Sequence, residues 1–152
     1  MKGCGMRITL VVICAVLLSA IFASAEETRP IGLVKTASGD AFILRDGVRL
    51  AAHPGLELML GDQLTTGTGG ALGVILRDDT VISLGPATQT RLEQFAFEPA
   101  QGNLGLVLRV TRGLIEYLSG KISKLAPGSV RIETPVATLG IRGTHLLARI
   151  VP

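Results

Sequence analysis

The stretch Phe42-Ile43-Leu44-Arg45-Asp46-Gly47-Val48-Arg49-Leu50 shows in miniature how this chain is expected to fold. Two mostly apolar segments flank Asp46-Gly47, and both turn residues tolerate the positive φ of a type I′ turn, so the stretch predicts a two-residue β-hairpin. The chain repeats this alternation, because its 19 glycines and 7 prolines separate short runs rich in Val, Ile, Leu and Thr. We therefore predict an all-β single domain of about a dozen short strands, arranged as a β-sandwich or a short β-solenoid.

A second hairpin is predicted further along the chain, where residues 73–76 and 80–84 flank Asp78-Asp79. Adjacent carboxylates at such a turn point apart, so we interpret them as solvated turn residues and not as a catalytic pair. Residues 87–97 contain apolar residues at helical spacing but also alternate along their length. We interpret this segment as a strand.

The N-terminus has the three parts of a secretory signal peptide. Lys2 and Arg7 precede an uncharged apolar run over residues 8–22, and Ala23-Ser24-Ala25 follows it. The run is shorter than the ~20 residues of a membrane-spanning helix. We predict a signal peptide over residues 1–25 and an exported bacterial domain over residues 26–152, periplasmic or secreted. The alternative is an uncleaved leader, the only membrane attachment expected.

Charge and residue clusters argue against several function classes. Lys2 and Arg7 account for much of the net charge of +3, so the predicted domain is close to neutral, and no nucleic-acid partner is expected. Both cysteines, Cys4 and Cys14, lie in the predicted leader, which leaves no disulfide for the domain. His53 and His145 stand apart from other ligand residues. We predict no metal, no cofactor, no catalytic residues and no enzymatic activity.

The segment from Glu133 to Thr144, which we call the closing motif, combines a proline, two glycines and an isolated arginine. Pro135 suits a strand start or an edge. Gly140 and Gly143 bracket Arg142, and we expect the chain there to bend or to approach another backbone closely.

Arg142 carries five donors in a planar fork inside an apolar segment, so it is expected to meet a carboxylate or a ring of carbonyls. Asp62 is the first candidate partner and Glu133 the second. The favoured interpretation is a structural clip between two turns. The alternative is a site for an anion or for a partner.

Three blocks of sequence and the closing motif together resemble the FecR-like periplasmic domain family, over about residues 61–145. The blocks are residues 61–67, which begin with Gly-Asp, residues 76–86 around the second hairpin, and residues 93–99 followed by 106–113 and 119–122; the closing motif adds its Thr-Pro and Arg-Gly-Thr. Asp79 stands where family members usually have glycine. The candidate family-motif positions are Gly61, Asp62, Thr134, Pro135, Gly140, Arg142, Gly143 and Thr144.

The resemblance implies an envelope module and not an enzyme. FecR-like regulators relay the state of an outer-membrane receptor to a sigma-factor system, but we expect this chain to lack the cytoplasmic segment that contacts the sigma factor. We predict a periplasmic binding or signalling module, whose partner is another envelope protein or a second copy of itself, with a glycan as a further candidate. The alternative is a structural or assembly module that joins an envelope complex through strand edges, including the apolar residues 146–152.

Overall fold

The computed structural model describes residues 29–151, and twelve of its segments are β-strands that form one open, curled sheet. This confirms the predicted all-β class and the number of strands. The predicted signal peptide over residues 1–25 lies outside the described residues. In the described part, no helix is long and apolar enough to cross a membrane.

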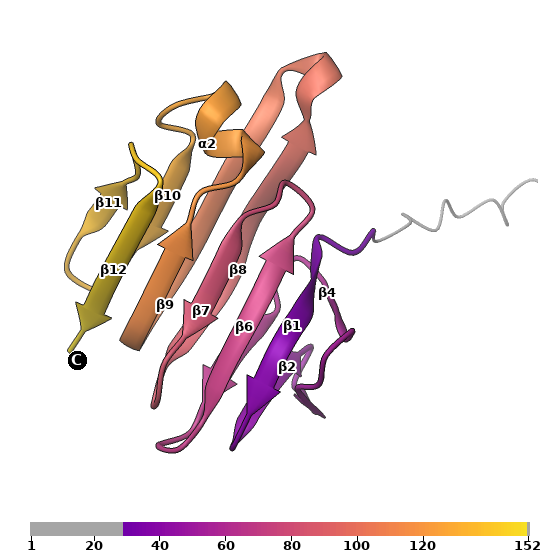
Figure 1. The fold of residues 1–152 in the computed structure, drawn as a ribbon, viewed down its shortest axis with the longest axis vertical. Helices are drawn as coiled ribbons and strands as arrows, with labels where there is room; N and C mark the ends of the chain where they lie inside the picture. The colour runs from indigo at the N-terminus through magenta and orange to yellow at the C-terminus, as the bar shows by residue number, and fades with distance from the viewer. Residues whose placement is uncertain (1–28, 152) are drawn as a thin grey trace, which may run out of the picture.

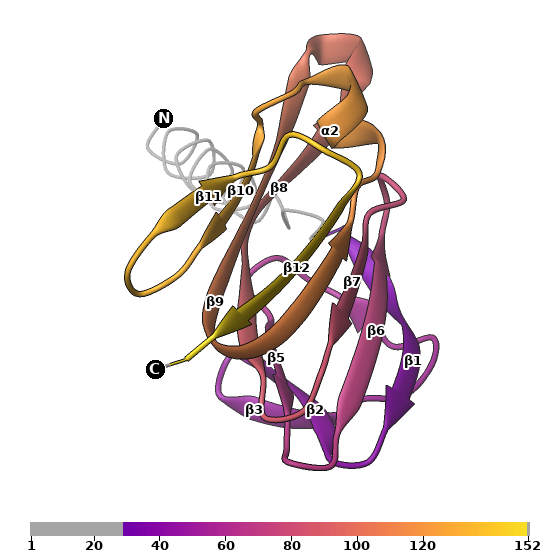
Figure 2. The same ribbon diagram turned by 60° about the vertical axis from the view of Figure 1, so that its left-hand side comes forward.

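The sheet has two halves that share one long strand, β9 (Asn103–Leu118), as Figures 1 and 2 show. The first half runs in the order β4 (Glu57–Leu58), β1 (Gly32–Ser38), β6 (Ala71–Leu76), β7 (Val81–Leu84), β9 and β12 (His145–Ile150). The second half runs in the order β3 (Val48–Ala51), β2 (Ala41–Arg45), β5 (Gln63–Thr66), β8 (Gln89–Glu98), β9, β10 (Val130–Glu133) and β11 (Thr138–Gly140).

Strand β9 changes partners at a bend near Gly113. Residues before the bend pair with β8 and with β10, the latter in parallel, while residues after it pair with β7 and β12. Gly113 has a φ of +100°, and a Cβ there would lie 2.3 Å from Thr88 Oγ1. Glycine is therefore required where the sheet curls.

The curled halves enclose one hydrophobic core. Val74, Ile82 and Ile115 from the first half are fully buried, as are Ile43 and Leu92 from the second half. All five side chains belong to the same packed cluster, because alternate residues of each strand point to the inside of the curl. The two halves thus face one another as the layers of a sandwich do, although the hydrogen-bonded sheet is continuous.

The predicted turns form as expected, with one substitution. Asp46 and Gly47 have φ values of +49° and +80°, which fit the predicted type I′ turn between β2 and β3. Asp79 has a φ of +67° in the turn between β6 and β7, so aspartate adopts here the left-handed conformation that glycine usually supplies. The ambiguous segment over residues 87–97 is a strand for most of its length, β8.

Two short helical segments interrupt the strands: η2 (Pro99–Gln101) and α2 (Lys121–Leu125). Helix α2 follows β9 directly and covers one end of the curl (Figure 1). The sequence did not predict it, because five residues are too few to show a helical period.

Candidate functional site

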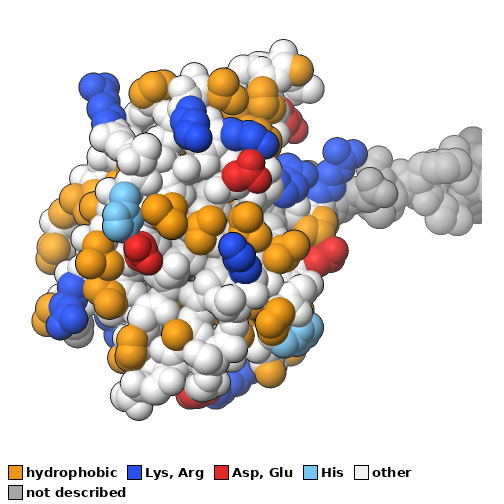
Figure 3. Space-filling model, viewed as in Figure 1, with side chains coloured by type: hydrophobic (Ala, Val, Ile, Leu, Met, Phe, Trp, Pro, Cys, Tyr) orange, Lys and Arg blue, Asp and Glu red, His pale blue; other side chains and the backbone are white. Residues whose placement is uncertain are grey.

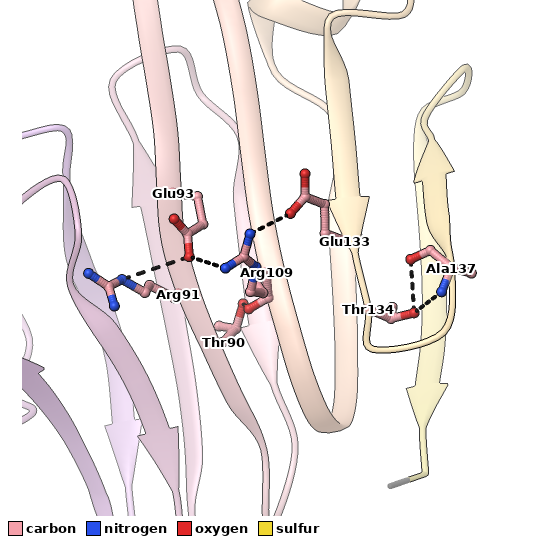
Figure 4. A network of polar contacts seen from close by, with 7 residues as sticks. All are labelled: Thr90, Arg91, Glu93, Arg109, Glu133, Thr134 and Ala137. Atoms are coloured by element: carbon pink, nitrogen blue, oxygen red, sulfur yellow. Dashed lines mark hydrogen bonds and ion pairs between the residues drawn. The ribbon is translucent and has the colours of Figure 1, made fainter.

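The Thr-Pro pair of the closing motif makes the turn between β10 and β11. Thr134 Oγ1 accepts a hydrogen bond from the Ala137 amide and donates one to the Ala137 carbonyl, both at 3.0 Å, as Figure 4 shows. The Thr134 amide also donates to the Ala137 carbonyl at 2.8 Å. Pro135 occupies the turn itself, where a missing amide hydrogen costs nothing. Thr134 and Pro135 thus have a structural role.

Glu133, at the end of β10, pairs with Arg109 of β9 and not with Arg142. The two side chains lie 2.9 Å apart, and Arg109 also lies 3.3 Å from Glu93 of β8 (Figure 4). The hydrogen bond to Glu133 and then the charge of Glu93 raise the pKa of Arg109. The network ties β8, β9 and β10 together across their outer face.

Asp62 also has a different partner from the one predicted. Its buried carboxylate accepts hydrogen bonds from Arg45 Nε at 2.8 Å, from an Arg45 terminal nitrogen at 2.7 Å and from the Met59 amide at 2.9 Å. The hydrogen bond to Asp62 raises the pKa of Arg45. Gly61, with a φ of +87°, makes the turn that places this carboxylate under Arg45. The prediction that Asp62 meets Arg142 is wrong, because Arg45 lies on β2, the neighbour of the strand that Asp62 precedes.

Arg142 is exposed and, among residues 29–151, has no hydrogen bond or ion pair with another side chain. It is therefore not the buried clip that the sequence favoured. The predicted reason for its flanking glycines is also wrong: a Cβ at Gly140 or Gly143 would meet nothing within 4 Å, and neither residue has a positive φ. The fold does not require glycine at these two positions, which leave the backbone open on the surface.

Arg142, Gly143 and Thr144 line part of a cleft of about 590 Å³. We call it the closing-motif cleft, and its lining residues are Ser119, Ser123, Lys124, Pro127, Arg142, Gly143 and Thr144. The Thr144 carbonyl accepts hydrogen bonds from the Ser119 amide at 2.9 Å and from Ser119 Oγ at 3.4 Å. These bonds fix the loop after β11 against the end of β9.

Helix α2 also lines the closing-motif cleft, through Ser123 and Lys124, and the buried Asp78 holds this helix in place. The Asp78 carboxylate accepts hydrogen bonds from Thr80 Oγ1 at 2.7 Å and from the Ile122 amide at 3.3 Å. Its carbonyl accepts a third from the Lys121 amide at 2.6 Å. The prediction that both turn aspartates are solvated is therefore wrong for Asp78, which has no exposed surface, and correct for Asp79, which is exposed.

Tyr117 lies beneath the same turn. Its side chain is fully buried, and burial raises the pKa of its hydroxyl to about 12, with the Asp78 carboxylate adding to the effect and Thr80 opposing it. Below this raised pKa the phenol stays neutral, so Tyr117 adds no charge to the core.

Strand β12 forms the free end of the first half of the sheet and follows the closing motif directly. Its outward residues His145, Leu147 and Arg149 are exposed, and its inward residues Leu146 and Ala148 are only half-buried. Leu147 is 61% exposed. Figure 3 shows hydrophobic side chains gathered at the margin of the molecule where β12 lies.

The two histidines lie apart from one another. His145 Nε2 is 2.8 Å from Glu116 Oε1, and His53 Nδ1 is 3.2 Å from the Pro54 carbonyl. Among residues 29–151, no group of three or more His, Cys, Asp or Glu side chains could hold a metal ion.

Comparison with protein families finds one match: the model described as "FecR protein" matches residues 62–151, well over half of the 152 residues. The match begins at Asp62, covers the second hairpin and the closing motif, and ends beyond β12. Comparison with curated proteins and with solved structures finds no match. A FecR domain indicates an envelope-associated signalling or regulatory domain.

Proposed function

Because the chain belongs to the FecR protein family, we propose that it is a non-enzymatic binding module of the bacterial envelope, which recognises a partner protein at the free edge of β12. The observation that carries the proposal is an unpaired strand edge next to the family's closing motif. Export to the periplasm is part of the proposal and rests on the predicted signal peptide.

The edge of β12 differs from the other strand edges in the described residues. Natural sheets protect their edges by keeping edge strands short or by placing charges on them. Strands β4 and β11 are two and three residues long, and β3 has four residues. Exposed charges lie on both β3 (Arg49) and β12 (Arg149), so length is what separates β12 from the other edges. Strand β12 has six residues and pairs only with β9 along one side. It is the longest of these edges.

Side-chain burial along β12 supports strand addition from a partner. Leu146 and Ala148 point to the inside of the curl yet remain half-buried, so the core is incompletely covered at this end. An extended partner segment would pair with the free backbone groups of β12, and its side chains would cover both residues. Exposed Leu147 and Val151 would add apolar contacts on the outer side.

The same edge also supports the assembly alternative, in which β12 pairs with β12 of a second copy. Edge strands pair equally well with copies and with foreign segments, since backbone hydrogen bonds carry no sequence information. The two alternatives differ in whether the purified protein associates with itself.

The test compares Leu147→Lys with a matched control, Val48→Lys on edge strand β3. Leu147 and Val48 are 61% and 58% exposed, so neither change disturbs the core. The three proteins, each with an affinity tag, are used to capture partners from the envelope fraction. We expect one recurrent partner with the wild type and with Val48→Lys, and its loss with Leu147→Lys, because a charge on an edge strand opposes pairing.

Light scattering of the purified proteins separates the alternatives. Concentration-dependent dimers that disappear with Leu147→Lys support assembly through β12. A partner that both variants retain, or that both lose, contradicts recognition at β12. A monomeric wild type that captures nothing from the envelope contradicts the proposed function in both forms.

A further inference from the structure

We propose that the closing-motif cleft binds a phosphate group, carried by a small molecule or by a lipid headgroup. The inference goes beyond the proposed function and does not depend on it, because β12 supplies none of the residues that line the cleft. It rests on the positive charge of the cleft, on the largely buried residue Ser123 and on the hydrogen bonds that hold the lining segments in place.

The charge of the cleft is positive. Lys124 comes from α2 and Arg142 from the loop after β11, and no aspartate or glutamate is among the lining residues. Within residues 29–151, neither cation has an ion pair, whereas the neighbouring Lys121 is paired with Asp79 at 2.8 Å. Two cations that face one cleft without a counter-charge repel each other, and a bound anion would relieve that repulsion.

Ser123 supplies the second, independent observation. The residue is only 8% exposed, yet it lines the cleft, and in the described part of the chain its hydroxyl makes no hydrogen bond. A polar side chain this deeply buried normally has a partner. Ser123 thus offers a hydroxyl donor among the residues that line a cleft with two cations.

The backbone at Gly143 is open toward the same space. A Cβ on Gly143 would meet nothing within 4 Å, and its φ is not positive, so neither packing nor conformation requires glycine there. An absent side chain lets a ligand oxygen approach the backbone closely. Close approach of a ligand would therefore explain glycine at position 143, which neither packing nor backbone conformation requires.

Both walls are held in place before any ligand binds. Asp78 fixes the start of α2 through the Lys121 and Ile122 amides, and Ser119 fixes Thr144 through its amide and hydroxyl. A fixed frame lowers the entropy lost on binding. The lining offers cationic and neutral donors, and the planar guanidinium of Arg142 matches two oxygens of a phosphate.

The volume of the cleft favours a phosphate attached to a larger group. At 590 Å³ the cleft is in the range of about 300–1,000 Å³ that is typical of small-molecule sites, and is far larger than a free phosphate ion. A sugar phosphate, a glycerol phosphate or a phospholipid headgroup has the required size. All of them present the same chemistry to Arg142, Lys124 and Ser123.

The test titrates the full chain with glycerol phosphate at constant ionic strength and follows backbone amide NMR signals. We expect the Ser123 and Gly143 signals to shift in the wild type. Arg142→Gln should weaken binding about tenfold or more, because it removes a charge-assisted hydrogen bond. Lys35→Gln is the matched control: it removes one charge from an exposed residue of β1, outside the cleft, and should leave the affinity unchanged.

A second arm uses vesicles of phosphatidylcholine with and without phosphatidylglycerol. Binding to glycerol phosphate supports a soluble ligand, and binding only to phosphatidylglycerol vesicles supports a headgroup, provided that Arg142→Gln weakens it and Lys35→Gln does not. No binding in either arm, or equal weakening by the two variants, overturns the inference. Because Arg142 and Lys35 are exposed, both variants should melt at the temperature of the wild type. The melting curves thus separate a loss of binding from a loss of folding.

Discussion

Replacing Gly113 by alanine should destabilise the protein strongly. Gly113 sits where β9 passes from one half of the sheet to the other. It combines a φ of +100° with a contact to Thr88, whose hydroxyl accepts a hydrogen bond from the Leu114 amide at 2.9 Å. The change therefore strains the backbone and displaces a buried hydroxyl at once.

The magnitude follows from the geometry at Thr88. An ideal Cβ on residue 113 would lie 2.3 Å from Thr88 Oγ1 and 2.4 Å from Thr88 Cα, and a backbone atom cannot move aside as a flexible side chain can. A non-glycine residue at such a φ costs roughly 1–3 kcal/mol, and overpacking adds about 1–3 kcal/mol. We expect a loss of about 3–4 kcal/mol in the free energy of unfolding, or a fall in Tm of roughly 10 °C or more for a domain of this size.

The assay is urea unfolding of the wild type, Gly113→Ala and the control Gly140→Ala. A Cβ at Gly140 would meet nothing within 4 Å, and its φ is not positive, so the control should lie within about 0.5 kcal/mol of the wild type. Equal stability of the two variants would refute the reasoning, because it would mean that β9 does not bend against Thr88 as the structure shows.

Three further predictions concern buried polar groups. Arg45→Met should cost about 2 kcal/mol of stability, because it leaves the buried Asp62 carboxylate without its main partner. Lys121→Met breaks an exposed pair and should cost less than about 1 kcal/mol. Equal losses of the two variants in urea unfolding would contradict this prediction. Tyr117, the chain's single tyrosine, has a pKa of about 12 in the folded protein against 10.0 when unfolded. The contribution of the neutral phenol to the free energy of unfolding is therefore fully present below pH 10. It is lost as the pH rises toward 12, by up to about 3 kcal/mol. Tyrosinate absorbance that develops near pH 10 in the folded protein would show that the hydroxyl is not buried. Asp78→Ala should speed amide exchange at the start of α2 while the strands stay protected, and unchanged exchange there would mean that Asp78 does not hold the helix.

The sequence predicts those features of the fold that local chemistry determines. Asp46-Gly47 carries its turn type in two residues, and the alternation along residues 89–98 suffices to identify a strand. Pro135, for which the sequence predicted a strand start or an edge, lies instead in the turn between β10 and β11 that Thr134 closes. The curl of the sheet could not be predicted, because it depends on Gly113 meeting Thr88, two residues that only the completed fold brings together.

Pairing of charged residues is the part of the site that the sequence could not predict. The sequence predicts that Asp62 and Arg142, the carboxylate and the cation of two turn-rich motifs, pair with one another. Asp62 instead pairs with Arg45, because β2 and β5 are neighbours. Ser123 and Lys124 carry no signal in the sequence, since their importance comes from the way Asp78 fixes a five-residue helix opposite Arg142.

Recognition at the edge of β12 is the central claim, and photo-crosslinking in intact bacterial envelopes tests it most directly. A photoreactive residue is placed at position 147 in one protein and at position 48 in another, two exposed positions on edge strands at different ends of the sheet. We predict a discrete crosslinked partner from position 147 and none from position 48. The same adduct from both positions, or from position 48 alone, would contradict recognition at β12.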